Sequence, residues 1–135
     1  MKFLFDVMQK MKPFATLSST LSADSPCAVT GVSGVHKANI ISTLCHLKNV
    51  RAFCAAQNEG EAQTLCNDLC TMGVRAYVYP SRDFTFMNIE GESHEYEHQR
   101  LKVLLKLLDG ACDVAIACVD AACQLTVPRQ VLRDT

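Results

Sequence analysis

The order of hydrophobic and polar positions predicts a repeated strand–helix pattern over most of the chain. Short apolar runs alternate with longer segments in which apolar residues recur every three or four positions, the spacing of one helix face. The runs predict strands and the longer segments predict helices. Their order is strand 27–30, helix 37–47, strand 52–55, helix 59–72, strand 76–79, helix 93–108 and strand 114–118.

The predicted strands are continuous apolar runs rather than alternating ones, which is typical of a parallel sheet covered by helices on both faces. Strand–helix units of this length connect parallel strands by crossovers in an open sheet. Gly73 and Gly110 follow two of the helices, where a left-handed cap is needed. The predicted fold class is therefore α/β, with an open and mainly parallel sheet.

The first residues predict a separate helix before this domain. Phe3, Leu4, Val7 and Met11 have the spacing of an amphipathic helix, which we expect to end at Pro13. A connector rich in Ser and Thr follows over residues 16–25. We therefore divide the chain into an N-terminal helix and connector, 1–25, and an α/β domain, 26–135. With four strands, we expect this domain to be an incomplete half-module of a longer protein.

Composition narrows the classes of function. The chain has 135 residues, of which 49% are hydrophobic and 20% charged, and a net charge of −1. Such a balance lacks the basic surface that holds nucleic acid by electrostatics alone. No secretory signal and no apolar run of membrane-spanning length is visible, so we expect a cytoplasmic protein without a membrane partner.

Eight cysteines are present without any C-x-x-C pair, and we interpret them as reduced thiols, most of them in the core. They are Cys27, Cys45, Cys54, Cys66, Cys70, Cys112, Cys118 and Cys123.

The turn between the first predicted strand and helix is close to the phosphate-binding loop G-x-x-x-x-G-K-[ST]. Gly31 and Lys37 are in register, but His36 replaces the second glycine and Ala38 replaces the hydroxyl that binds Mg²⁺. The pattern predicts a degenerate phosphate loop in which Gly31 and Gly34 make a tight turn. Lys37 and the helix start could still attract an anion. A functional nucleotide-binding domain with an atypical loop is the alternative.

A second motif, H-E-x-x-H, is formed by His94, Glu95 and His98. On a helix the two histidines share a face and can bind zinc while the glutamate activates water, which makes a zinc hydrolase a second alternative. A catalytic zinc site needs a third protein ligand, and no later histidine follows. We interpret the motif as a solvated helix start with Ser93 as N-cap. The predicted buried positions of this helix are Leu101, Leu104, Leu105 and Leu108.

A family resemblance rests on three segments. They are Tyr79-Pro80-Ser81-Arg82-Asp83-Phe84 followed by an acidic stretch, then Gln99-Arg100-Leu101-Lys102-Val103-Leu104, and finally Val119, Ala121, Gln124 and Pro128. Together they resemble the amino-terminal module of the bacterial transcription-repair coupling factor. That module is itself similar to the first domain of the B component of the bacterial excinuclease, a P-loop helicase-like protein. The resemblance covers residues 28–132.

The resemblance implies a P-loop NTPase-like fold of the helicase domain 1 type that has lost its ATPase motif. This chain would then have no catalytic residue and no cofactor of its own. The parent protein would be an ATP-dependent DNA translocase, using ATP and Mg²⁺, that displaces stalled RNA polymerase and recruits the excinuclease A component for nucleotide excision repair. This chain would contact other domains of the same polypeptide, and DNA would bind to the motor.

Overall fold

A computed structural model describes residues 2–22, 24–82 and 95–133. Three parallel strands form the sheet of this part of the chain, in the order β1 (Ala52–Ala56), β3 (Val114–Cys118) and β2 (Ala76–Tyr79). Val114 is aligned with Ala52 on one side and with Ala76 on the other. All five residues of the central strand β3 are buried.

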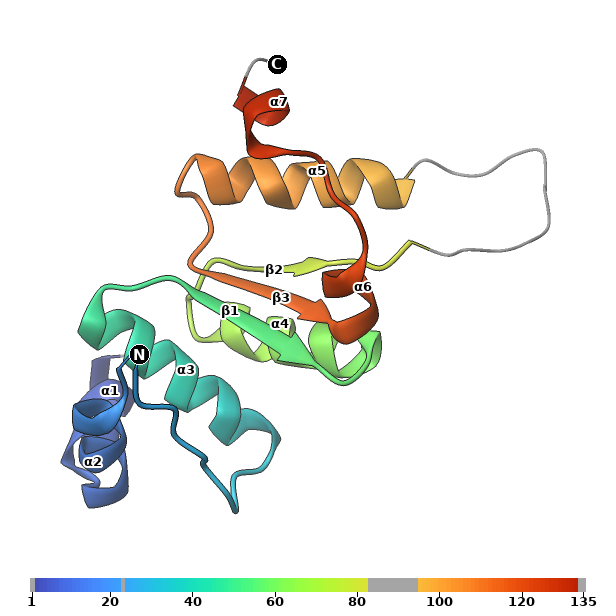
Figure 1. Cartoon of the computed structure of the whole chain (residues 1–135). Coiled ribbons are helices and arrows are strands. Elements are labelled where there is room, and N and C mark those ends of the chain that lie inside the picture. The colour runs from blue at the N-terminus through green and yellow to red at the C-terminus, as the bar shows by residue number, and fades with distance from the viewer. Residues whose placement is uncertain (1, 23, 83–94, 134–135) are drawn as a thin grey trace.

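Helices cover both faces of this sheet (Figure 1). α3 (Gly34–Lys48) and α4 (Glu59–Thr71) lie on one face, and α5 (Glu95–Leu108) lies on the other. The main core, which includes Leu69, Val114 and Ile116, forms between the sheet and the helices α3 and α4. The predicted α/β class, with a small open parallel sheet and helices on both faces, is confirmed.

Most predicted elements form where the pattern placed them. β2 and β3 have the predicted bounds, and β1 and α4 differ from them by one residue. Gly73 and Gly110 have φ values of +80° and +70°, the left-handed conformation expected after a helix. Asn58 caps α4, because its side-chain oxygen accepts a hydrogen bond from the backbone N–H of Glu61 at 2.8 Å.

The strand predicted over residues 27–30 is wrong. This segment has no regular secondary structure, and Ala28, Val29 and Thr30 are exposed. The run is only four residues long, between Pro26 and Gly31, and a strand gains its hydrogen bonds only beside another strand. The described sheet consequently has three strands instead of four, and α3 begins at Gly34, three residues before its predicted start.

The N-terminal helix does not end at Pro13. α1 (Lys2–Lys10) is followed at once by α2 (Lys12–Thr20), in whose first turn Pro13 lies. Proline suits that position because its missing N–H has no acceptor there. The hydroxyls of Thr16 and Thr20 donate back to the carbonyls of Lys12 and Thr16, so the Ser/Thr-rich stretch is largely helical rather than a connector.

Two burial predictions need correction. In α5 the fully buried residues are Arg100 and Val103, while Leu101, Leu104 and Leu108 are half-buried and Leu105 is 43% exposed. In β1, alternate residues pack on the core but Phe53 is 63% exposed, because this edge strand is covered on one face only. Two short helices, α6 (Val119–Cys123) and α7 (Arg129–Arg133), end the described chain.

Candidate functional site

The carboxyl ends of the three strands meet at one edge of the sheet, where open α/β proteins bind their ligands. Side chains here join the segments that follow different strands. The carboxylate of Glu59, after β1, accepts hydrogen bonds from the backbone N–H and the hydroxyl of Ser81, after β2, at 2.8 and 2.5 Å. These bonds lower the pKa of Glu59, because they stabilise its charged form.

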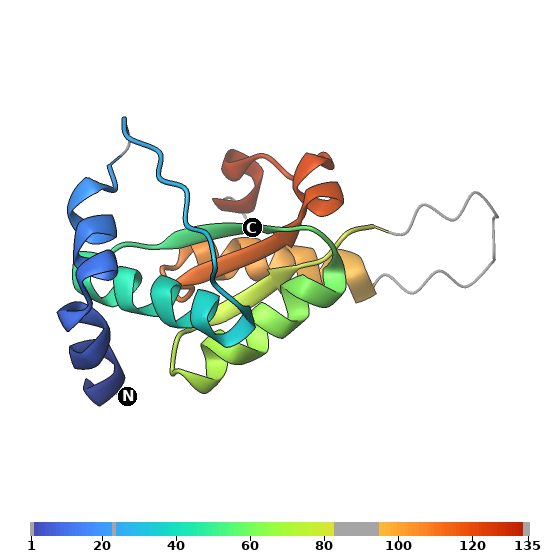
Figure 2. The ribbon, with the colours of Figure 1, turned by 90° about the horizontal axis from the view of Figure 1, so that it is seen from below.

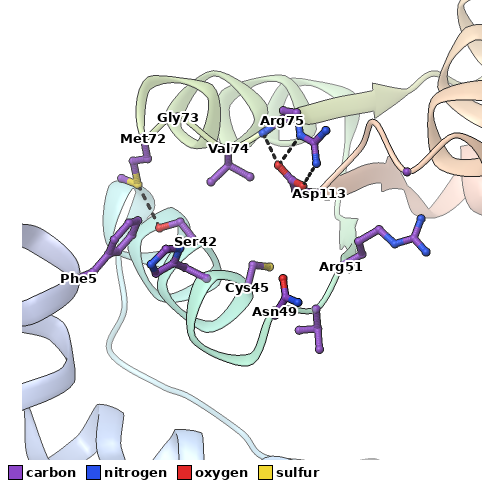
Figure 3. A pocket seen from close by; sticks show the side chains of 13 residues that line it. Phe5, Ser42, Cys45, Asn49, Arg51, Met72, Gly73, Val74, Arg75 and Asp113 are labelled. Atoms are coloured by element: carbon purple, nitrogen blue, oxygen red, sulfur yellow. Dashed lines mark hydrogen bonds and ion pairs between the residues drawn. The ribbon is translucent and has the colours of Figure 1, made fainter. Parts of the chain in front are cut away.

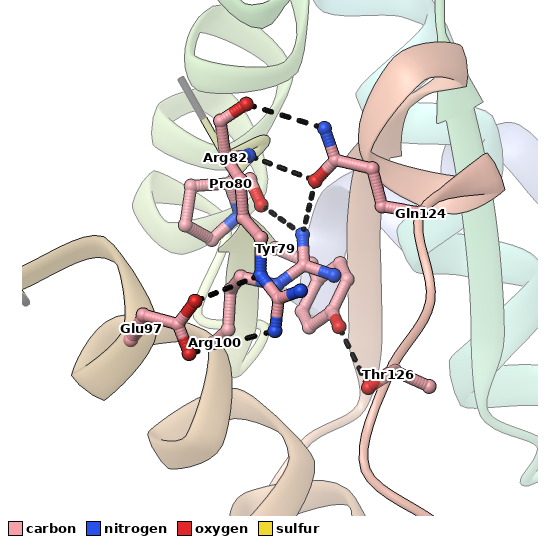
Figure 4. A network of polar contacts seen from close by, with 7 residues as sticks. All are labelled: Tyr79, Pro80, Arg82, Glu97, Arg100, Gln124 and Thr126. Atoms are coloured by element: carbon pink, nitrogen blue, oxygen red, sulfur yellow. Dashed lines mark hydrogen bonds and ion pairs between the residues drawn. The ribbon is translucent and has the colours of Figure 1, made fainter. Parts of the chain in front are cut away.

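The centre of this edge is the guanidinium of Arg100 (Figure 4). Arg100 comes from α5 and is only 2% exposed. Its Nη1 donates to the carbonyl oxygen of Pro80 at 2.6 Å and to Oε1 of Gln124 at 3.1 Å. The guanidinium carbon lies 4.0 Å from the centre of the Tyr79 ring, which gives a cation–π contact.

Gln124 joins the segment after β3 to the segment after β2. Its Oε1 accepts from the backbone N–H of Arg82 at 2.8 Å, and its Nε2 donates to the carbonyl of Arg82 at 3.3 Å. One side-chain amide thus pairs with both backbone groups of one residue. Arg82 also forms an ion pair with Glu97 at 2.9 Å.

A further bond joins the Tyr79 hydroxyl to Thr126, at 2.9 Å. We refer to the seven residues Tyr79, Pro80, Arg82, Glu97, Arg100, Gln124 and Thr126 as the Arg100 cluster.

The electrostatics of Arg100 are those of a structural cation. Its Nη1 donates to a carbonyl and an amide oxygen, and burial lowers the pKa of Arg100 by removing water from the charged group. Its Nη2 is buried without a hydrogen-bond partner in the described part of the chain. A side chain this enclosed can hold three segments together, but it does not present its charge to a dissolved substrate.

The degenerate phosphate loop lies apart from a strand end. Gly31 has φ +74°, a left-handed conformation that favours glycine, and Gly34 is the first residue of α3. The backbone N–H groups of His36 and Lys37 both donate to the carbonyl of Ser33, at 2.9 and 3.3 Å, as the first turn of α3 forms. The side chains of His36 and Lys37 are exposed, whereas Ala38 is 0% exposed and belongs to the main core. A hydroxyl in place of the Ala38 methyl would therefore point into apolar surroundings.

The H-E-x-x-H motif is only partly described. Ser93 and His94 lie outside the described residues, Glu95 is the first residue of α5, and His98 is exposed. Within the described ranges, no three side chains of His, Cys, Asp or Glu are close enough together to hold a metal ion.

The thiols lie in different environments. Cys66, Cys112 and Cys118 are buried, and Cys70 and Cys123 are exposed. Burial raises the pKa of Cys54 to about 11, helped by its neighbour Cys45, and burial likewise raises the pKa of Cys66 to about 11. Both groups are therefore protonated at neutral pH, and a protonated thiol is a poor nucleophile.

A pocket of about 620 Å³ opens at the opposite, amino edge of the sheet (Figure 3). Two of its charged residues pair with each other: Arg75 Nη2 lies 2.6 Å from Asp113 Oδ1, and the Nε and backbone N–H of Arg75 donate to Oδ2. These hydrogen bonds lower the pKa of Asp113. The Ser42 hydroxyl donates to the sulfur of Met72 at 3.6 Å. Arg51 also lines the pocket, and its Nη1 donates to the carbonyl of Leu107 at 3.0 Å, so the pocket holds one closed ion pair and one cation bonded to a backbone carbonyl.

Comparison with known proteins gave no match to any family model, any curated protein or any solved structure. None of the described helices has the length and apolar character needed to cross a membrane. The site must therefore be interpreted from its own geometry. Along the sequence, Arg100 and Gln124 stand out only as parts of the segments on which the family resemblance rests, and nothing in their spacing indicates that the two side chains pair.

Proposed function

We propose that this chain is a non-catalytic interaction module from a transcription-repair coupling factor. The observation that carries the proposal is the Arg100 cluster, whose internal hydrogen bonds lie at the sheet edge where α/β domains usually bind substrates or nucleotides. The residues of the cluster include Pro80, Arg82, Arg100 and Gln124, which also belong to the segments that resemble the coupling factor.

The degenerate loop supports the same proposal. Its Mg²⁺-binding hydroxyl is replaced by the buried methyl of Ala38, and the segment before it pairs with no strand in the described sheet. In this proposal the fold is a half-module of the P-loop helicase domain 1 type that has lost its nucleotide site. Lys37 is exposed at the start of α3 and retains a weak attraction for anions.

The parent protein would supply the chemistry. We propose an ATP-dependent DNA translocase whose motor, elsewhere in the polypeptide, uses ATP and Mg²⁺ to displace stalled RNA polymerase and to recruit the excinuclease A component in the cytoplasm. This module would brace the neighbouring domains of the same chain. An alternative, a functional nucleotide-binding domain, predicts a measurable affinity for ATP.

Two experiments test the proposal. Millimolar ATP with Mg²⁺ should leave the thermal midpoint of the purified chain unchanged, because a ligand that binds only the folded state would raise it. A rise that corresponds to micromolar binding would favour the nucleotide-binding alternative. For the parent, deletion of the gene should remove the faster repair of the transcribed strand after ultraviolet damage. An undiminished difference between the two strands contradicts the coupling-factor assignment.

A further inference from the structure

Strand β1 leaves one of its two backbone edges unpaired in the described part of the chain. The N–H of Ala52 donates to the carbonyl of Asp113, just before β3, at 2.9 Å, so Ala52 and every second residue after it turn their backbone groups toward β3. In a parallel pair, successive residues of a strand bond in opposite directions. The N–H and C=O groups of Phe53 and Ala55 therefore point outward, and no described group bonds to them.

The edge strand on the other side of the sheet, β2, differs because side chains of α4 bond to it. The outward carbonyl of Ala76 accepts from the thiols of Cys66 and Cys70 at 3.5 and 3.6 Å. Proteins commonly prevent a sheet edge from pairing with another chain by placing Lys, Pro or a bulge in the strand, or by covering it. β1 contains neither Lys nor Pro, and its unbroken register with β3 leaves no bulge. Its edge can therefore accept a further strand.

The residues of this edge are apolar and uncharged. On one face of β1 Phe53 is 63% exposed and Ala55 is exposed, while Cys54 on the other face packs against the core. Residues 27–30 are a second uncharged run, and their backbone groups form no hydrogen bond with any other described residue. Figure 2 shows the segment that contains them crossing the β1 side of the sheet rather than the β2 side. Neither run carries a charge that would attract a charged partner.

We propose that the outer edge of β1 binds an extended, uncharged apolar segment of a protein partner, which becomes a fourth strand of the sheet. Only an extended backbone has N–H and C=O groups at the spacing that Phe53 and Ala55 present. The proposal rests on the interaction-module function and names the class of partner segment. A second copy of this chain fits less well, because it would bring its own β3 to the side of the sheet that the segment before α3 crosses (Figure 2).

The test uses a synthetic peptide of about ten residues, rich in Val, Ile and Thr and with a lysine at each end for solubility. Its control is the same peptide N-methylated at two successive central residues, which blocks both edges of the strand and leaves the side chains unchanged. Fluorescence anisotropy with the whole chain should show the unmodified peptide binding at least about tenfold more tightly, because the control cannot form the backbone hydrogen bonds. Equal binding of the two peptides overturns the proposal.

A proline at the edge tests the backbone of β1 itself. Ala55→Pro removes the outward N–H and leaves the ladder with β3 intact, since proline is tolerated where an edge strand faces solvent. It should weaken binding of the unmodified peptide by about tenfold or more. The matched control is Ala55→Val, which keeps the N–H at the same exposed position and should leave binding unchanged. Circular dichroism checks that both variants fold, and unchanged binding by folded Ala55→Pro overturns the proposal.

Hydrogen exchange locates the peptide without any substitution, so it decides even where Ala55→Pro fails to fold. The peptide should slow exchange of the Phe53 and Ala55 amides at least about tenfold and leave the amide of Leu125, which is 88% exposed, unchanged. Absence of protection at Phe53 and Ala55 overturns the proposal. Self-association in sedimentation that Ala55→Pro abolishes would make a second copy the occupant and also overturns it. Failure of these experiments leaves the non-catalytic proposal intact, because ATP binding tests that proposal separately.

Discussion

At the residue scale, Arg100 shows how a charge can be buried with a carbonyl and an amide oxygen, and no described carboxylate, as hydrogen-bond partners. Its guanidinium gives one nitrogen to a carbonyl and an amide oxygen and rests against the Tyr79 ring. Such contacts compensate part of the cost of desolvation, because each acceptor carries a partial negative charge. The arrangement fixes the backbone at Pro80 and the side chain of Gln124 relative to α5, so this one residue orders the carboxyl edge.

Arg100→Met should lower the free energy of unfolding by about 2–3 kcal/mol, because the carbonyl of Pro80 loses its donor and Oε1 of Gln124 keeps only the N–H of Arg82. Urea unfolding at neutral pH measures the loss. Lys102→Met is the matched control on the exposed side of the same helix and should change stability by less than about 0.5 kcal/mol. If Arg100→Met is as stable as the control, Arg100 is not the organising residue of the cluster.

Asp113 should make stability depend on pH. Its pKa is lowered in the folded state by the Arg75 side chain, so its stabilising contribution is complete above the unfolded-state value of about 4. The contribution is lost as the pH falls through the lowered folded-state pKa. Asp113→Asn should therefore reduce the loss of stability between neutral pH and about pH 3, measured as the shift in urea midpoint.

Arg75→Gln provides the comparison for this prediction. It removes the side-chain bonds to Asp113 but keeps the backbone N–H bond to Oδ2, so it should reduce the pH dependence by less than Asp113→Asn does. An unchanged pH dependence in both variants would mean that other carboxylates, such as Glu59, account for acid destabilisation.

At the element scale, the sequence predicts an element where local signals and burial agree. α4 has a capping residue at its start and Gly73 after its end, and β3 is an apolar run that becomes the fully buried central strand. The segment 27–30 has the same apolar character but gains neither a partner strand nor full burial. The pattern does not predict α2, because serine and threonine favour connectors in general, whereas here their hydroxyls bond within the helix.

The cap of α4 gives a prediction for a single element. Asn58 accepts from the backbone N–H of Glu61, and the Glu61 carboxylate accepts from the backbone N–H of Gln57 at 3.4 Å. Asn58→Ala should destabilise the chain by about 1 kcal/mol, since one N–H of the first turn loses its acceptor. Asn58→Asp should retain most of the stability. Thermal unfolding of the two variants side by side tests this. Equal losses of stability in both would show that the hydrogen bond accepted by the side chain of residue 58 does not account for the effect.

At the scale of the whole molecule, the candidate site depends on distances that the sequence does not contain. Parallel strands bring the segments after β1, β2 and β3 to one edge, and this much follows from the predicted fold. The pairing of Arg100 with Gln124 does not follow from it, because 24 positions separate them and the contact needs the register of β2 against β3 and the rotation of α5. Open α/β sheets commonly bind a ligand at this edge, and here the Arg100 cluster lies there.

The whole fold also determines whether substitutions in the degenerate loop can restore nucleotide binding. His36→Gly/Ala38→Thr restores the template G-x-x-x-x-G-K-[ST] in full, but a phosphate site also needs the loop to continue from a strand end, with the hydroxyl of its last residue free to reach Mg²⁺. Here the preceding segment is outside the sheet and position 38 is in the core.

We expect the double variant to bind no ATP–Mg²⁺ by calorimetry and to lose about 1–3 kcal/mol of stability, because an extra polar group enters the core. His36→Gly alone, at an exposed position, separates the two effects and should cost no more than about 1 kcal/mol, the helix propensity of glycine. Micromolar ATP binding by the double variant would mean that two substitutions alone inactivated a nucleotide site whose architecture is otherwise complete.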